Sequence, residues 1–249
     1  MIINFLIIIQ ENMKYSIIIP CYNEKDNIDY LINRITPLQK KYDLEYVLVE
    51  NGSQDRSREY FEKNVDGKYP NIKVVYVKRN LGYGYGLQQG IKIASGDYIG
   101  WIHADLQMPP EELCVFFDEI EKHKKEEKLF LKGIRTNRSA FDKFFTNGQS
   151  LMNSILFGKK IYDVGAIPVV FHSSLIKNKI DDMPNDFSIE LYVYKEATIN
   201  SFKVIRYKVK LLKREKGNSS WNHGLKSKIK QSKIIFIDSL KIKRGEKVR

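Results

Sequence analysis

Short apolar runs rich in β-branched residues alternate with amphipathic segments over the first half of this 249-residue chain. The runs with the length and composition of buried strands lie at residues 15–20, 46–49, 72–77, 98–102 and 129–134. Helical spacing after the first run is seen in Ile28, Leu31, Ile32, Ile35 and Leu38. Strands that alternate with helices of this length predict an α/β fold with a doubly wound, mostly parallel sheet.

A polar cluster follows the end of four of these runs. The clusters are CYNE (21–24), ENGSQD (50–55), KRNLGYGYG (78–86) and HADLQ (103–107). In doubly wound sheets, ligands bind beyond the carboxyl ends of the strands. The sequence therefore predicts that four loops converge on one edge of the sheet and form a binding site there.

The alternation becomes less regular after residue 139. We expect a helix at 141–156, a strand at 165–171, a helix around 187–197 and a strand at 202–212. Because no internal repeat and no Ser/Gly-rich linker separates this part, we expect it to fold onto the sheet. The predicted organisation is one domain at 1–221, with halves at about 13–135 and 136–221, and a basic amphipathic tail at 222–249.

The basic charge of the chain is concentrated near its C-terminal end. Residues 201–249 hold 16 Lys and Arg against 3 Asp and Glu, whereas the rest of the chain is close to neutral. This asymmetry indicates a tail that meets phosphates, on anionic lipid, nucleic acid or a pyrophosphate substrate, or else lysines kept for solubility. Leu225 and Ile229 have helical spacing and IIFI (234–237) lies among lysines, so an interfacial helix is our hypothesis. The alternative is that IIFI packs against the domain.

The cysteine content and the first residues bear on localisation. Cys21 and Cys114 are too few for a disulfide framework, which favours a reducing, intracellular compartment. Residues 2–9 are apolar but much shorter than the ~20 residues that span a bilayer, and they lack the flanks of a secretory signal. Met13 directly precedes a strand and is an alternative start. We expect a cytoplasmic protein, with peripheral contact at the cytoplasmic face of the membrane as the hypothesis for the tail.

The HADLQ segment has the pattern of a metal-binding loop. His103, Asp105 and Gln107 alternate with Ala104 and Leu106, so in an extended chain the three polar side chains would point the same way. A divalent cation held there would bridge a diphosphate and neutralise charge on a leaving nucleotide. The alternative is that the aspartate caps the helix that follows.

Two further clusters could bind parts of a nucleotide. Glu50 and Asn51 could hydrogen-bond a base or ribose, or could form a turn and a helix N-cap. Gly82, Gly84 and Gly86 open a helix whose backbone N–H groups could face phosphate, although the spacing is not that of a dinucleotide or Walker motif.

Arginines in loops are suited to bidentate phosphate recognition. Arg135 and Arg138 follow a predicted strand, and Arg214 lies in a segment that contains glycine. Surface ion pairing is the alternative for each of them.

These segments, in this order, resemble one family. IIIPCYNE (17–24), ENGSQD (50–55), NLGYGYGLQQGIKIASGDY (80–98) and HADLQMPPE (103–111) are similar to motifs of the large inverting glycosyltransferase family that contains dolichyl-phosphate mannose synthases and bacterial polyprenyl-phosphate sugar transferases. KGIRTNR (132–138) and REKGNSSW (214–221) are similar to later segments of that family. The similarity covers residues 15–221.

The resemblance implies the A-type glycosyltransferase fold, a UDP-, GDP- or dTDP-linked sugar as donor, and Mn²⁺ or Mg²⁺ as cofactor. The residues that it places at the donor are Pro20, Tyr22, Glu24, Glu50, Asn51, Gly82, His103, Ala104, Arg135 and Arg214. Asp105 and Gln107 would hold the metal, with His103 as a further ligand. Asp105 and Glu190 are the predicted catalytic residues, Glu190 as general base if the acceptor is a hydroxyl.

Two positions depart from the family pattern. His103 stands where the family has a carboxylate, and Asn51 replaces the second acid of a paired motif. Imidazole is a softer ligand than carboxylate, so His103 would favour Mn²⁺ or bind a phosphate instead.

The predicted function is transfer of the sugar, with inversion, to a polyprenyl phosphate or glycan acceptor in cell-envelope glycan or glycolipid synthesis. The alternative is a catalytically inactive relative that binds a nucleotide sugar, which the two departures would permit. The basic tail lacks a recognisable nucleic-acid module, so we expect no nucleic-acid partner.

Overall fold

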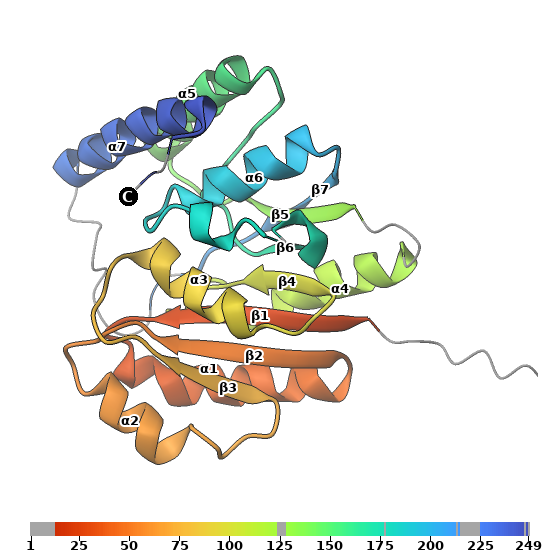
Figure 1. The fold of residues 1–249 in the computed structure, drawn as a ribbon, viewed down its shortest axis with the longest axis vertical. Helices are drawn as coiled ribbons and strands as arrows, with labels where there is room; N and C mark the ends of the chain where they lie inside the picture. The colour runs from red at the N-terminus through yellow and green to blue at the C-terminus, as the bar shows by residue number, and fades with distance from the viewer. Residues whose placement is uncertain are drawn as a thin grey trace, which may run out of the picture.

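The computed structural model describes residues 13–123, 128–176, 178–212, 214, 225–246 and 248, apart from the side chains at 141 and 225–231. The described chain forms a seven-stranded sheet with the order β3-β2-β1-β4-β6-β5-β7 (Figure 1). The strands are β1 (Lys14–Cys21), β2 (Asp43–Glu50), β3 (Ile72–Tyr76), β4 (Tyr98–Trp101), β5 (Leu129–Arg135), β6 (Val169–His172) and β7 (Lys203–Val209). The helices are α1 (Ile28–Ile35), α2 (Ser57–Asn64), α3 (Tyr83–Ile93), α4 (Leu113–Lys122), α5 (Ala140–Phe157), α6 (Ile189–Ile199) and α7 (Leu225–Arg244).

The strand directions place one set of loops together. β1 pairs in parallel with β2 and β4, β2 with β3, and β5 with β7, whereas β6 runs antiparallel between β4 and β5. The predicted mostly parallel α/β sheet is therefore confirmed. The carboxyl ends of the six parallel strands lie at one edge, which is where doubly wound sheets bind ligands.

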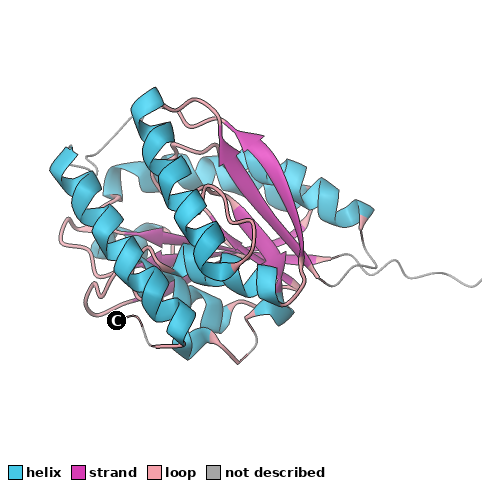
Figure 2. Ribbon diagram, turned by 90° about the horizontal axis from the view of Figure 1, so that it is seen from above, coloured by secondary structure: helices cyan, strands magenta, loops and turns pink. Residues whose placement is uncertain are grey.

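Both faces of β1 are covered by helices, which explains its continuous apolar sequence. α3 packs on one face, where a Cβ added to Gly90 would lie 2.5 Å from Cγ2 of Ile18. α4 packs on the other face, where the rings of Tyr15 and Phe117 are 4.3 Å apart. Figure 2 shows the twisted sheet with helices on either side.

Helix α1 ends earlier than the apolar spacing predicted. Ile28, Leu31, Ile32 and Ile35 are buried, and the chain continues as a 3₁₀ helix at Thr36–Lys40. The proline at 37 has no N–H to continue the α-helical bonds, so Leu38 lies outside the helix and is only half-buried.

The second half of the chain folds onto the sheet, as predicted. The C-terminal helix α7 packs against α5 in this half. α7 lies beside α5 (Figure 1) and buries Asp238, Ser239 and Ile242. Asp238 accepts a hydrogen bond from Ser188 at 2.8 Å, and Ser239 donates one to Asn153 at 2.9 Å. Part of the predicted tail is thus integral to the fold, and the boundary at 221–222 stays a prediction. Among the described helices, none is both long and apolar enough to cross a bilayer.

The glycines at the start of α3 permit close contact with the segment before α6. A Cβ on Gly82 would overlap the carbonyl oxygen of Asn185, and one on Gly84 would overlap that of Pro184. Tyr85 N donates to the Asn185 carbonyl at 2.9 Å. The structure therefore assigns these glycines to backbone packing, and a phosphate contact at Gly82 stays a prediction.

Gly84→Ala is expected to lower the free energy of unfolding by about 1–3 kcal/mol, because the added methyl group meets backbone atoms that cannot rotate away. Gly148→Ala in α5 is the matched control, since nothing lies within 4 Å of its Cβ position and alanine gains up to about 1 kcal/mol of helix propensity. Urea denaturation of both variants measures the difference. Equal stability of the two would contradict the packing role.

At the opposite edge of the sheet, a buried carboxylate of β2 contacts β1, β3 and the segment before β4. Glu45 accepts hydrogen bonds from Ser16 Oγ at 2.5 Å and Ser95 N at 2.7 Å, and Lys73 Nζ lies 2.7 Å away. Burial acts to raise the pKa of Glu45, but these donors outweigh it and lower the pKa to about 2.

Because the folded-state pKa is depressed, the stabilisation by Glu45 is present above about pH 4.5 and is lost as the pH falls towards 2. Glu45→Gln should therefore flatten the decline of unfolding free energy over that range, by roughly 2–3 kcal/mol in total. Asp43→Asn, at the exposed start of the same strand, is expected to leave the slope unchanged. Parallel slopes for wild type and Glu45→Gln would disprove the assignment.

Candidate functional site

The loops that follow β1 and β2 are joined at the edge of the sheet. Asn51 N donates to the Cys21 carbonyl at 2.9 Å, and Glu50 Oε1 accepts from Ser53 N at 2.6 Å. Glu50 is fully buried, and Nη1 of Arg58 lies 3.7 Å from its Oε2. The amide of Asn51 donates to the Gly82 carbonyl at 3.1 Å.

Two buried oxygens in these loops have no hydrogen-bond partner among the described residues. They are Glu50 Oε2 and Asn51 Oδ1. Buried polar atoms in native proteins are nearly always satisfied, so an unsatisfied pair points to a missing ligand or water. Both residues were predicted to contact a base or ribose, and that contact stays a prediction. Pro20, near the end of β1, and Tyr22, directly after it, are half-buried.

The HADLQ segment turns instead of running straight. Leu106 has φ of 56°, in the left-handed region, and Asp105 Oδ1 accepts from Gln107 N at 3.1 Å. The expectation that an extended chain would point His103, Asp105 and Gln107 the same way is therefore wrong.

The three polar side chains of this segment contact three different parts of the chain. His103 Nε2 lies 3.3 Å from the hydroxyl of Tyr83, and Gln107 Nε2 donates to the Leu212 carbonyl at 3.3 Å. Asp105 contacts Arg214, and Ala104 is buried. Their common role as metal ligands stays a prediction.

Arg214 connects the loops after β1 and β4. Its Nη2 lies 2.6 Å from Glu24 Oε1 and 3.4 Å from Asp105 Oδ2. Burial raises the pKa of Glu24 and the charge of Asp105 adds to this effect, whereas hydrogen bonds from Asn27 and Arg214 oppose it. Two largely buried carboxylates thus share one guanidinium.

The residues present fit a cation that arrives with a diphosphate. Within the described residues, no group of three or more His, Cys, Asp or Glu side chains is arranged to hold a metal. Magnesium-type sites at nucleotides commonly use only one or two carboxylates, with phosphates and water as the other ligands. Asp105, a carboxylate at the edge where ligands bind, meets that requirement.

Glu190, at the start of α6, lies in a buried polar cluster. It is 3% exposed and accepts hydrogen bonds from Trp101 Nε1 at 2.6 Å and Tyr83 OH at 3.1 Å. Its Oε2 is 2.7 Å from Nζ of the fully buried Lys132. Burial lowers the pKa of Lys132, and the charge of Glu190 opposes this effect. The predicted role as general base is untested, and the surroundings are those of an anion that anchors other side chains.

Arg135, at the end of β5, forms an ion pair with Asp163. Its Nε donates to Asp163 Oδ1 at 3.0 Å, its backbone N donates to Oδ2 at 3.0 Å, and its Nη2 also contacts Oδ1. Although burial acts to raise the pKa of Asp163, these bonds and the charge of the arginine hold it below its usual value. Arg138 contacts Thr146 and lies 3.9 Å from Asp163. Both arginines therefore lie beside a buried carboxylate, which differs from the surface ion pairing given as the alternative, and a phosphate contact of Arg135 stays a prediction.

Three residues of this region had no role predicted from the sequence: Tyr83, Trp101 and Lys132. A lysine inside an otherwise apolar strand, as in LFLKGIR, is a signal of a buried charge that needs a partner. Tyr83 lies in the glycine-containing segment NLGYGYG, where the sequence gives no signal that separates it from Tyr85.

Comparison with known proteins places these observations in a family. The undecaprenyl-phosphate 4-deoxy-4-formamido-L-arabinose transferase of Yersinia pestis (strain Pestoides F) is 31% identical over 169 residues, which cover 66% of this chain and 50% of that protein. The dolichol-phosphate mannosyltransferase of Pyrococcus furiosus is 37% identical over 109 residues, which cover 44% and 30%. The chain thus spans about half the length, or less, of these curated relatives.

A solved structure shows the same fold. Glucosyl-3-phosphoglycerate synthase from Mycobacterium tuberculosis, crystallised with Mn²⁺, UDP and glucosyl-3-phosphoglycerate, superposes with a TM-score of 0.66 at 17% identity, covering 94% of this chain and 81% of that one. The predicted A-type glycosyltransferase fold is confirmed. The sequence pattern of "Glycosyl transferase family 2" matches residues 16–173, and the chain therefore belongs to this family.

Proposed function

We propose that this protein transfers a sugar from a nucleoside-diphosphate sugar to a polyprenyl phosphate, with inversion at the anomeric carbon. The observation that carries the proposal is the meeting of Asp105, Glu24 and Arg214 at the carboxyl edge of the parallel sheet. Membership of glycosyl transferase family 2 supports the reaction class. The names of two relatives, which include undecaprenyl phosphate and dolichol phosphate, support the acceptor class.

Asp105 would hold a divalent cation, Mn²⁺ or Mg²⁺, with Gln107 and His103 as further candidate ligands. When bound, the cation neutralises charge that develops on the departing nucleoside diphosphate. Glu50 and Asn51 would take the nucleoside, since Asn51 Oδ1 and Glu50 Oε2 have no hydrogen-bond partner among the described residues, although Arg58 lies 3.7 Å from Glu50 Oε2. Arg214, paired here with Glu24 and Asp105, would exchange one carboxylate for a phosphate oxygen, which a guanidinium binds equally well.

A phosphate acceptor simplifies the chemistry. Its oxygen is already anionic, so no side chain needs to remove a proton before attack. Glu190 is buried against Lys132 and receives hydrogen bonds from Trp101 and Tyr83, which suits a structural anion better than a base that must meet an acceptor. This observation favours a lipid phosphate over a hydroxyl of a glycan.

Asp105→Asn should reduce sugar transfer at least about 100-fold, because the cation loses the carboxylate that fixes its position, and the charge stabilisation at stake is several kcal/mol. The assay uses undecaprenyl phosphate in detergent, Mn²⁺ or Mg²⁺, and radiolabelled UDP-, GDP- and dTDP-sugars, with lipid-extractable label as the product. Asp43→Asn, at the far edge of the sheet, should retain full activity.

If the Asp105→Asn variant transferred sugar at the wild-type rate, the role assigned to this residue would be refuted. A wild-type chain that gains thermal stability from nucleotide sugars but transfers none of them would show the alternative, a binding protein without catalysis.

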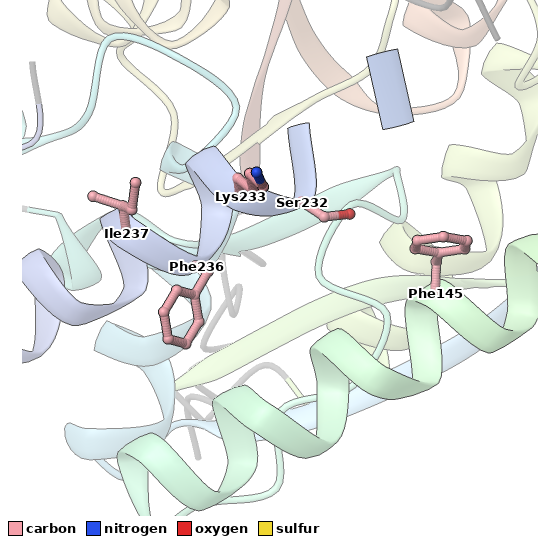
Figure 3. Close-up of a pocket in the computed structure, with 5 residues that line it drawn as sticks. All are labelled: Phe145, Ser232, Lys233, Phe236 and Ile237. Atoms are coloured by element: carbon pink, nitrogen blue, oxygen red, sulfur yellow. The ribbon is translucent and has the colours of Figure 1, made fainter. Parts of the chain in front are cut away.

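The outer faces of α5 and α7 support contact with a membrane surface. Phe144, Leu151 and Ile155 of α5 are 75%, 64% and 74% exposed. An apolar hollow of about 330 Å³ lies between the helices, lined by Phe145, Ser232, Lys233, Phe236 and Ile237 (Figure 3). Phe236 and Ile237 are about half exposed, so the alternative that all of IIFI packs against the domain is not what the structure shows.

Helix α7 is also basic in sequence. The sequence of α7 holds seven Lys and Arg and a single acid, Asp238, whose side chain is buried. Apolar side chains flanked by lysines bind anionic bilayers, and each basic residue near the surface contributes about 1 kcal/mol. We infer that this face rests on the membrane that contains the lipid acceptor.

The triple substitution Phe144→Ser, Leu151→Ser and Ile155→Ser should weaken binding to vesicles of phosphatidylglycerol and phosphatidylcholine by about tenfold or more, because the lost apolar burial is worth several kcal/mol. The control is Ile93→Ser with Ile199→Ser, two exposed apolar residues on other helices. Vesicle co-sedimentation measures both proteins. Equal binding of triple variant and wild type would exclude this face as the contact surface.

A further inference from the structure

The segment that follows β7 is held by a side chain from the loop after β5. Residues 210–212 form a connector that leads from the end of β7, at Val209, towards Arg214. Asn137 Nδ2 donates to the Leu211 carbonyl at 2.5 Å, and Leu211 N donates to Asn137 Oδ1 at 2.9 Å. One amide side chain thus binds both main-chain groups of a single residue.

The next residue of the connector is held from the loop after β4. Leu212 N donates to the Gln107 carbonyl at 2.7 Å, and Gln107 Nε2 donates to the Leu212 carbonyl at 3.3 Å. In an extended chain, the main-chain groups of successive residues point to opposite sides. Leu211 and Leu212 follow this pattern, so the connector runs between the loops after β5 and β4.

Asn137 continues the pairing of β5 with β7 beyond the point where their main-chain ladder stops. The last paired residues of that ladder are Arg135 and Val209, and Thr136 N donates to the Val209 carbonyl at 3.2 Å. Beyond them, the side-chain amide of Asn137 offers one donor and one acceptor to Leu211, as a peptide group would. The chain that leaves β7 is therefore kept beside β5 as far as Leu211.

The course of the connector limits where Arg214 can reach. Arg214 lies three positions after Leu211, and a chain extends by at most ~3.3–3.6 Å per residue. With Leu211 fixed, the guanidinium meets Glu24 at 2.6 Å and Asp105 at 3.4 Å. These carboxylates belong to the loops after β1 and β4, where the proposed donor would place its diphosphate.

We infer that Asn137 is a positioning residue for the sugar donor, and that it acts through Leu211 on Arg214. Only the pairing of Arg214 with a donor phosphate is taken from the proposed function. Asn137 itself does not have to touch the donor. Without its two bonds, Leu211 would move more freely, and the cost of ordering the connector and Arg214 would reduce the affinity for the diphosphate.

Asn137→Ala should weaken the binding of a nucleoside diphosphate by about 5- to 20-fold, because binding must then order the connector. Calorimetry with UDP, GDP and dTDP in the presence of Mn²⁺ measures the affinity of the full chain, and the nucleotide that the wild type binds most tightly is used for all variants. In the transfer assay, the KM for the sugar donor should rise in the same proportion, whereas the KM for undecaprenyl phosphate should stay unchanged.

Asn64→Ala, at the end of α2, is the matched control. Asn64 is also exposed, and its amide also donates to a main-chain carbonyl, that of Tyr60 at 3.1 Å. This variant should change neither the affinity for the nucleotide nor either KM.

A double-mutant cycle separates positioning from a general structural role. If Asn137 acts through Arg214, then Asn137→Ala should cause less than about a twofold further loss of nucleotide affinity in a chain that already carries Arg214→Ala. A merely structural role would give the same fold-loss in both backgrounds. Hydrogen exchange of the Leu211 amide, followed by nuclear magnetic resonance, should be faster in Asn137→Ala than in the wild type.

Four results would overturn the inference: equal fold-losses in the two backgrounds, unchanged nucleotide affinity in Asn137→Ala, no binding of any of the three nucleotides to the wild type, or an Asn137→Ala chain that circular dichroism shows to be unfolded. The outcome is separable from that of the proposed function. Sugar transfer by the wild type together with additive losses would refute only the role of Asn137. A non-additive cycle in a chain that transfers no sugar would refute only the proposed reaction.

Discussion

The ion pair between Lys132 and Glu190 connects the two halves of the fold. Lys132 is fully buried in β5, and Glu190 reaches it from α6 while also accepting from Trp101 in β4 and Tyr83 in α3. Removing one partner of such a pair leaves an uncompensated buried charge, at a cost of roughly 3–5 kcal/mol. Strand β5 and helix α6 are therefore held in one relative position, and Tyr83, which contacts both Glu190 and His103, is held from inside the core.

The architecture could be predicted because it follows from local pattern. Each apolar run became a strand within a few residues of its expected bounds, since a strand buried on both faces must be apolar throughout. Glu24 and Asp105, 81 positions apart in the sequence, were expected at one edge because parallel strands place their carboxyl ends together, and both contact Arg214. What the pattern could not supply was side-chain direction. The left-handed conformation of Leu106 redirects the chain between two candidate ligands, and nothing in the letters HADLQ indicates it.

The partners of buried polar groups were also beyond the sequence. A lysine in an apolar strand, such as Lys132, indicates that an acidic side chain lies beside it. The sequence contains many acidic residues, and only the structure identifies Glu190 of α6 as the partner. The glycines of α3 illustrate the same limit. A cluster of small residues before a helix is compatible with phosphate binding or with close packing, and only the position of residues 184–186 shows the second.

Charge balance bears on how the proposed donor would bind at this site. Glu24 and Asp105 together carry two negative charges in largely buried positions, and such charges need a partner in every state. Arg214 is that partner here. A cation that entered alone would compete with the guanidinium for the two carboxylates. A cation that entered with a diphosphate would bring anionic oxygens, and the guanidinium could pair with one of these instead. His103 stands where the resembled family has a carboxylate, so this segment brings one carboxylate, Asp105, to the site, and a bound cation would depend more on the oxygens of a diphosphate.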